Sequence, residues 1–284
     1  MRAFLDFWRK YSSLDPERMF DGWLREYMAR YPELLIKQVG SWGGLDELRD
    51  VMLRKVIPMI DELIHEIFEA WMITLEVAED VCSRAADLFK LDLDPIIVIY
   101  VGSGCGAGWA TTISNHPAVL LGLENAAELG WITEEKLKGL IAHELGHLHH
   151  MKLRRGWIEI EEAEKDPYFQ LYVEGFAQLC EHLILGHDSW HVAIGEDWLR
   201  ICKGRIGDFA EEYLRAAERG DVRAFFGPWL EVKGVKHVGH FLGHELMAWL
   251  RKDLGLSFRE IALLSRADVE SLSKRFLEEV AGKK

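Results

Sequence analysis

The segment Ala142–His150 combines histidines and a glutamate in a spacing that could bind a metal ion. It reads AHELGHLHH, so His143, Glu144 and His147 form the pattern H-E-x-x-H. On a helix, residues four apart share one face, and two imidazoles placed in this way can bind one Zn²⁺. Glu144 lies just beside that face, where its carboxylate can reach a metal-bound water without becoming a ligand. The motif therefore predicts a zinc site with Glu144 as the general base.

A catalytic zinc needs a third protein ligand and one position left open for water. The position six residues beyond His147, where a third histidine could complete a site, is Leu153. Glu174 is the best candidate, because it stands among apolar residues in YVEGFAQ, and charged side chains are rarely buried without a partner. Glycine costs about 1 kcal/mol inside a helix, and close approach to the motif helix would explain Gly175. Two alternative ligands look solvated: Glu181 and the acidic run 159–166.

Together, His143-Glu144-x-x-His147 and Glu174-Gly175-x-Ala177 resemble the motifs of the gluzincins, the thermolysin-like zinc peptidases. The chain looks most similar to a family of predicted zinc-dependent proteases and to the small intracellular minigluzincins. The resemblance covers about residues 95–250, and within this range only the two motifs are specific. It implies a zincin-like catalytic core, in which a small sheet precedes the motif helix and the glutamate helix. It also implies hydrolysis of peptide bonds.

One departure from this family lies four residues past the glutamate ligand. Relatives often carry an acid there that orients a zinc-bound histidine, whereas this chain has Gln178. The amide carbonyl could accept an imidazole N–H, but it cannot raise the basicity of the ligand as a carboxylate would. His150 lies on the ligand side of the motif helix and is a candidate supporting residue.

Relatives also carry a downstream Tyr or His that stabilises the oxyanion. Here the matching region holds His237, His240 and His244, spaced i, i+3 and i+7 on one helical face. We expect His240 or His244 to donate to the oxyanion, and His237 to be structural. A separate metal site and simple packing are alternatives for these histidines. Other candidates are Tyr168 and Tyr172 as donors, and His182, His187, His191 and Asp188 as a minor metal site.

The elements that must position these residues follow from local patterns. The runs Pro95–Val101 and Ala118–Leu123 are short and rich in β-branched or aliphatic residues, which predicts two buried strands. A helix capped by Thr133 and ending near Met151 would carry the first motif. The pair Asp166-Pro167 predicts the start of the helix that carries the glutamate.

The predicted fold is α+β and mostly helical. It would comprise a helical N-terminal segment, residues 1–90, and a zincin-like catalytic core, residues 91–190. A helical C-terminal segment, residues 191–284, would pack on that core. The first strands could pair with an extended peptide at a sheet edge.

A glycine-rich stretch, VGSGCGAGW, separates the two predicted strands. A dinucleotide-binding loop would need a helix immediately after it, whereas TTISNHP follows here, so a hairpin or a loop flanking the site is favoured. Further on, Gly122-Leu123-Glu124-Asn125 resembles the substrate-amine motif of zinc aminopeptidases. The alternative is a strand end with Asn125 capping the next helix.

Composition limits the remaining classes of function. The chain has 34 Lys and Arg against 47 Asp and Glu, a net charge of −13, which argues against nucleic-acid binding. Four cysteines, none in CxxC spacing, argue against a disulfide framework. No apolar stretch suits a signal peptide or membrane span, so we expect no membrane partner and a cytoplasmic location.

The sequence therefore predicts a zinc-dependent peptidase acting on a peptide or protein substrate, and it makes no prediction of the oligomeric state. Two alternatives are hydrolysis of another amide or an ester, and a non-catalytic zinc-binding or interaction protein that retains the helix pair.

Overall fold

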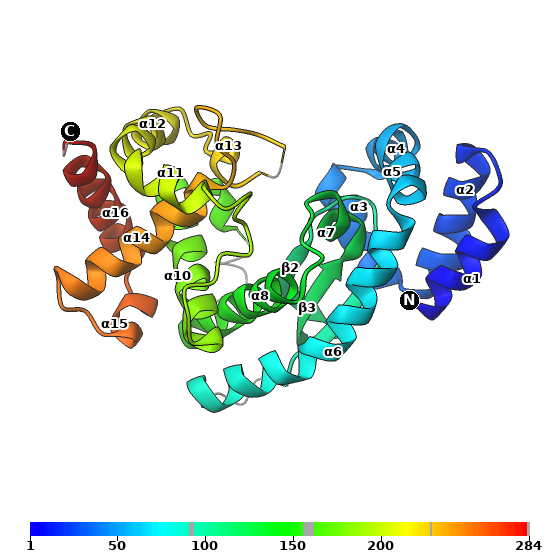
Figure 1. Cartoon of the computed structure of the whole chain (residues 1–284), viewed down its shortest axis with the longest axis horizontal. Helices are drawn as coiled ribbons and strands as arrows, with labels where there is room; N and C mark the ends of the chain where they lie inside the picture. The colour runs from blue at the N-terminus through cyan, green and yellow to red at the C-terminus, as the bar shows by residue number, and fades with distance from the viewer. Residues whose placement is uncertain (91–93, 156–161, 228, 283–284) are drawn as a thin grey trace. The chain divides into compact units, whose positions relative to one another are not determined.

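The computed structural model describes the 284-residue chain except for residues 91–93, 156–161, 228 and 283–284 (Figure 1). The described residues are mostly helical and include one three-stranded mixed sheet, which confirms the α+β expectation. The chain divides into two compact units. The first comprises Met1–Ser83 and Asp92–Ile141, and the second Arg84–Leu91 and Ala142–Lys284. The zincin-like core predicted for residues 91–190 stays a prediction.

The first unit begins with short helices around a buried aromatic and aliphatic core. Phe4, Trp23 and Tyr27 are almost completely buried, and their rings pack on one another or on neighbouring aromatic rings. None of the described helices of the chain is long and apolar enough to cross a membrane. The helices of this segment are α1 (Arg2–Tyr11), α2 (Pro16–Gly22), η1 (Trp23–Tyr27), η2 (Met28–Arg30), α3 (Pro32–Trp42), α4 (Leu45–Val51), η3 (Met52–Val56), α5 (Ile57–Glu62) and α6 (Ile64–Phe89).

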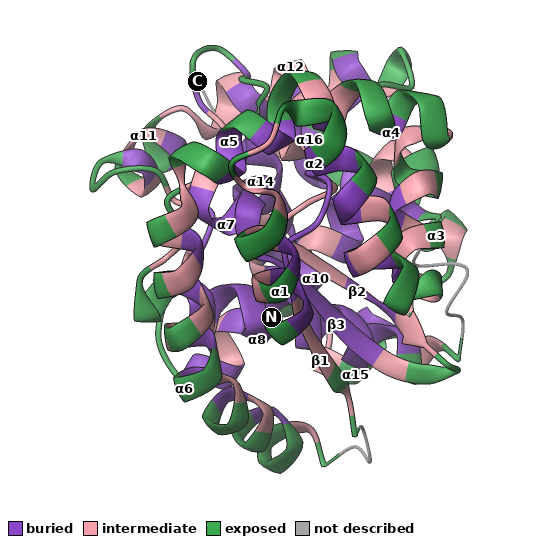
Figure 2. Cartoon of the chain, turned by 90° about the vertical axis from the view of Figure 1, so that its right-hand side faces the viewer, coloured by how far each residue is buried: buried purple, intermediate pink, exposed green. Residues whose placement is uncertain are grey.

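The sheet has the order β1-β3-β2, with β1 (Ile96–Tyr100) parallel to β3 (His116–Gly122) and β2 (Gly108–Ile113) antiparallel to it. The central strand β3 is buried along most of its length (Figure 2). Both predicted strands are confirmed, whereas β2 was not predicted. Ser114 and Asn115 join β2 to β3 with positive φ angles of 50° and 63°. Positive φ at both central residues is typical of a two-residue hairpin turn that matches the right-handed twist of the strands.

A buried carboxylate ties down the glycine-rich loop between β1 and β2. Oε2 of Glu124, in α7 (Leu123–Glu128), accepts the Gly102 N–H at 2.7 Å, and Oε1 accepts the Gly104 N–H at 3.0 Å. Asn125 Oδ1 accepts the Gly106 N–H at 2.8 Å, so Asn125 binds the loop from within α7 rather than capping the helix. Burial raises the pKa of Glu124 to about 7. Both carboxylate oxygens of Glu124 thus accept backbone N–H groups of the loop. The interpretation of Glu124 as a ligand for a substrate amine, as in aminopeptidases, is therefore left without support.

The predicted starts of the two motif helices are confirmed. Thr133 caps α8 (Glu134–Arg154) through its Oγ1, which accepts the Lys136 N–H at 3.3 Å. Asp166 caps α10 (Pro167–Leu185), where its Oδ1 accepts two backbone N–H groups of the first turn at 3.1 Å. The remaining described helices are η4 (Ala163–Lys165), α11 (Trp198–Gly204), α12 (Ile206–Glu218), α13 (Arg223–Phe226), α14 (Val238–Lys252), α15 (Phe258–Ala262) and α16 (Arg266–Ala281).

Glycines allow α10 to pack closely against two helices at once. A Cβ on Gly175 would lie 2.2 Å from the carbonyl oxygen of Gly243, so the backbones of α10 and α14 touch where they cross (Figure 1). The expectation that Gly175 meets the motif helix is therefore wrong, because its neighbour is α14. The motif helix approaches α10 through Gly146 instead, where a Cβ would lie 2.7 Å from the Cβ of Cys180 and 3.1 Å from Ala177 Cα.

Candidate metal centre

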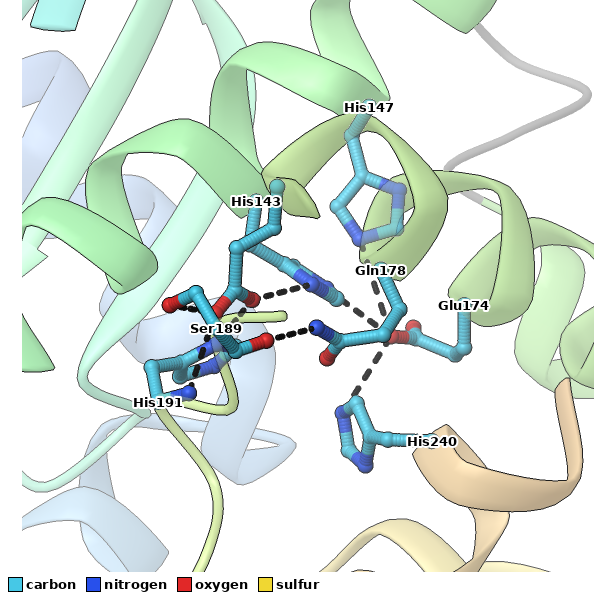
Figure 3. Close-up of polar contacts among 8 residues, drawn as sticks. His143, His147, Glu174, Gln178, Ser189, His191 and His240 are labelled. Atoms are coloured by element: carbon cyan, nitrogen blue, oxygen red, sulfur yellow. Dashed lines mark hydrogen bonds and ion pairs between the residues drawn. The ribbon is translucent and has the colours of Figure 1, made fainter. Parts of the chain in front are cut away.

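Three helices bring the motif residues together within the second unit. His143 and His147 lie on α8 and Glu174 lies on α10. The Nε2 atom of His143 is 3.2 Å from Oε2 of Glu174, and Nε2 of His147 is 3.7 Å from the same oxygen. His240 on α14 contributes a third imidazole, whose Nε2 is 3.4 Å from that oxygen (Figure 3). One carboxylate oxygen therefore has three imidazole nitrogens around it.

These spacings fit a set of donors around one metal ion. Donors bonded at about 2.0–2.1 Å to a tetrahedral ion lie roughly 3.3 Å from one another. The donor atoms of His143, Glu174 and His240 all lie within 4.8 Å of one another. Imidazole nitrogen and carboxylate oxygen are donors that zinc prefers, and they also suit iron and manganese. The site can thus hold a divalent transition metal, and the donor set alone does not select zinc.

Burial and mutual charge set the protonation of these groups. Burial lowers the pKa of His143 to about 4 and that of His240 well below its usual range, which keeps both imidazoles in the neutral form that binds metals. Burial alone would raise the pKa of Glu174. The charge of His147 and the hydrogen bond from His143 outweigh it, and hold the pKa well below the ordinary value. Glu174 is therefore ionised and ready to act as a ligand.

Glu144, the predicted general base, is also buried in this region. It directly follows His143 in α8 and only 6% of its surface is exposed. Burial alone would lower the pKa of His147, but the negative charge of Glu174 and, to a smaller extent, that of Glu144 raise it above its ordinary value. The carboxylate is thus within electrostatic range of the candidate ligands.

The three downstream histidines have different surroundings. His237 has a φ of 57° and caps α14 from outside the helix, so the three histidines do not share one helical face as predicted. His240 lies at the candidate metal centre, as described. His244 packs elsewhere, with its ring centroid 4.5 Å from that of His182 and 5.0 Å from that of Trp190. Of the two predicted oxyanion donors, the structure brings only His240 to Glu174.

Tyr172 was considered above as an oxyanion donor and His150 as a supporting residue. Both side chains instead form buried hydrogen bonds away from Glu174. The Tyr172 hydroxyl donates to the carbonyl oxygen of Ile261 at 2.5 Å and lies 3.1 Å from Nε2 of His150. Nε2 of His150 is also 3.2 Å from the carbonyl oxygen of Ala262. Both side chains are fully buried, so they link α8 and α10 to the end of α15. Tyr168 lies in the first turn of α10, beside the cap.

Glu181, set aside as solvated, is completely buried, so that expectation is wrong. Its Oε1 accepts the Ser189 hydroxyl at 2.7 Å and the His191 N–H at 3.0 Å. Its Oε2 lies 2.6 Å from Nδ1 of His191 and 3.8 Å from Nδ1 of His143. The other alternative ligand, the acidic run 159–166, lies partly outside the described residues.

Gln178 does not take the place of the orienting acid. Its Nε2 donates to the carbonyl oxygen of Ser189 at 2.9 Å (Figure 3). Glu174, Gln178 and Glu181 are spaced i, i+4 and i+7, which places them on one face of α10. In the sequence, that spacing was the signal that Glu181 lies on the same side of α10 as Glu174. His191 has no comparable signal, because it reaches the site from the loop after α10.

No known protein family, curated protein or solved structure matches this chain. The likeness to gluzincins therefore depends on the two sequence motifs, and function has to be inferred from the chemistry of the site.

Proposed function

We propose that this protein is a zinc-dependent peptidase of the gluzincin type. The observation that carries the proposal is the meeting of the H-E-x-x-H helix with Glu174. The Nε2 atoms of His143 and His147 lie 3.2 and 3.7 Å from one oxygen of Glu174. These three side chains would hold the ion. When bound there, zinc supplies a polarising charge for the substrate carbonyl and lowers the pKa of water toward neutrality.

Glu144 and His240 have separate roles in this proposal. Glu144 removes a proton from the attacking water and then delivers it to the leaving amine. His240 donates a hydrogen bond from its imidazole to the substrate oxygen as negative charge develops there. Its position 3.4 Å from Glu174 supports this role over that of His244, which packs on His182.

The order of elements also supports a zincin-like core, with the sheet first, then α8 and then α10. The proposed substrate is a peptide or protein, as the likeness of the two motifs to those of gluzincins implies, and the net charge of −13 disfavours nucleic acid as the alternative. A cytoplasmic location is part of the proposal. It is supported by the four cysteines, which are all free of disulfides.

The test is cleavage of a fluorogenic peptide library by the zinc-loaded wild type and by Glu144→Gln. We expect the variant to lose on the order of 10²–10⁴-fold in rate and to keep its zinc, as measured by elemental analysis. Glu135→Gln, which changes an exposed acid in the first turn of the same helix, is the matched control and should cleave as the wild type does.

Equal cleavage by the wild type and by Glu144→Gln would remove Glu144 as the base. Zinc binding without cleavage of any peptide in the library would refute the peptidase and favour the non-catalytic zinc-binding alternative.

A further inference from the structure

We propose that Glu181, held in place by Ser189 and His191, is a positioning residue that orients His143 for metal binding. The proposal deepens the proposed function, because it rests on the metal centre of His143, His147 and Glu174. In this proposal Glu181 takes the role of the orienting acid that gluzincins often carry at the position where this chain has Gln178.

The carboxylate of Glu181 is fixed by three donors. The Ser189 hydroxyl lies 2.7 Å and the His191 backbone N–H 3.0 Å from Oε1, while the ring Nδ1 of His191 lies 2.6 Å from Oε2. The residue is completely buried, so these contacts replace the water that a carboxylate would otherwise need. Gln178 contributes indirectly, because its amide binds the carbonyl oxygen of Ser189 and secures that segment a second time.

His143 lies between two carboxylates, each of which faces one ring nitrogen. Its Nε2 is 3.2 Å from Glu174, and its Nδ1 is 3.8 Å from Oε2 of Glu181. The ring of His191 packs against it edge-on, with centroids 4.8 Å apart. Among the described residues, Nδ1 of His143 has no hydrogen-bond partner within bonding distance. A shift of about 1 Å would bring it to the normal hydrogen-bond distance from Glu181.

Metal binding requires the proton of His143 to be on the side of Glu181. With Nε2 of His143 bound to a metal, the ring proton would have to reside on Nδ1. Without metal, the ionised Glu174 can only accept, so Nε2 carries the proton that is donated to it. Metal binding would therefore release the Nε2 proton to solvent and take one from solvent onto Nδ1, where the Nδ1–H would donate a hydrogen bond to Glu181. The carboxylate stabilises the tautomer that binds metal.

A second metal ion is the competing explanation, because donor atoms of His143, Glu181 and His191 lie within 4.8 Å of one another. The 2.6 Å separation between His191 and Glu181 is that of a hydrogen bond and is shorter than the roughly 3.3 Å between two ligands of zinc. Oε1 of Glu181 is also occupied by two donors. The geometry therefore favours a hydrogen-bonded support.

The experiment measures zinc affinity by competition with a fluorescent chelator, together with the number of zinc ions per chain. We expect Glu181→Gln to bind zinc about 10–100-fold more weakly and Glu181→Asp, which keeps the charge, to fall between it and the wild type. Glu218→Gln, which changes an exposed acid at the end of α12, is the control and should bind as the wild type does.

A double-mutant cycle separates positioning from a general effect on the fold. If Glu181 acts through His143, Glu181→Gln should have no further effect on zinc affinity in a His143→Ala background. An equal loss in both backgrounds, an unchanged affinity in Glu181→Gln, or two zinc ions per wild-type chain would each overturn the proposal. If Glu181→Gln does not fold, Ser189→Ala replaces it in the same cycle and should weaken zinc binding several-fold.

The outcomes distinguish this proposal from the peptidase. Zinc affinity is measured without substrate, so a chain that binds one zinc, depends on Glu181 and cleaves nothing would refute only the peptidase. A peptidase whose zinc affinity is unaffected by Glu181→Gln would refute only the positioning role.

Discussion

The crossing of α10 and α14 can be tested by adding a single methyl group at Gly175. In Gly175→Ala the new Cβ would lie 2.2 Å from the carbonyl oxygen, 2.3 Å from the carbonyl carbon and 2.7 Å from the Cα of Gly243. All three are backbone atoms of a helix, so no side chain can rotate away. The two helices have to separate by about 1 Å to restore ordinary contact.

The expected loss of stability follows from two opposing effects. Overpacking of a well-packed interior costs typically 1–3 kcal/mol, and more where only backbone can move. Alanine recovers about 1 kcal/mol through its greater helix propensity. We therefore expect Gly175→Ala to lower the free energy of unfolding by about 2 kcal/mol. At roughly 2–4 °C per kcal/mol for a unit of this size, the melting temperature should fall by about 4–8 °C.

Thermal and denaturant unfolding of the metal-free chain measure this loss. Gly40→Ala is the matched control, because Gly40 lies within α3 and a Cβ there would meet nothing within 4 Å. That variant should be stabilised by about 0.5–1 kcal/mol. If Gly175→Ala is also neutral or stabilising, the close approach of the two helices is wrong. A stable Gly175→Ala that binds zinc as the wild type does would argue against any effect of this crossing on Glu174 and His240.

Three further predictions concern single side chains. Glu174→Ala should weaken zinc binding on the order of 100-fold, since two histidines remain, and unchanged zinc retention in equilibrium dialysis would refute its role as a ligand. His240→Gln should lower kcat/KM on the order of 10²–10³-fold and leave zinc affinity within about twofold, whereas a large loss of zinc affinity would make it a ligand instead of a donor. Burial raises the pKa of Glu124 to about 7 from an ordinary 4.5, so its stabilising contribution is complete below pH 4.5 and is lost as the pH rises through 7. Between pH 5 and 8 the wild type should lose about 2–3 kcal/mol more stability than Glu124→Gln in denaturant titrations, and equal losses would contradict the pKa shift.

Local chemistry explains which elements could be predicted from the sequence. Thr133 and Asp166 mark helix starts because their side chains bind backbone N–H groups a few residues away, and this needs no tertiary contact. The β-branched run before Tyr100 predicts a strand for a similar reason. Strand β2 contains glycine and two threonines, and it is stabilised by pairing with β3, which local sequence does not specify.

The parts of the candidate site that were missed depend on contacts between distant segments. Glu181 looks like a surface acid until Ser189 and His191 are placed around it. Gly175 signals a close approach, but the choice of Gly243 over the motif helix is decided by how three helices cross. The sequence leaves His244 open as an alternative to His240, and only the direction of α14 decides that His240 meets Glu174 while His244 packs on His182.

The position of His240 on a helix that follows both motif helices in the chain has a consequence for biosynthesis. The motif helix and α10 leave the ribosome long before α14, so a nascent or prematurely terminated chain contains both motif histidines and Glu174 but not the third imidazole. The face of α10 at Gly175 would then lack α14, the helix whose Gly243 packs against it.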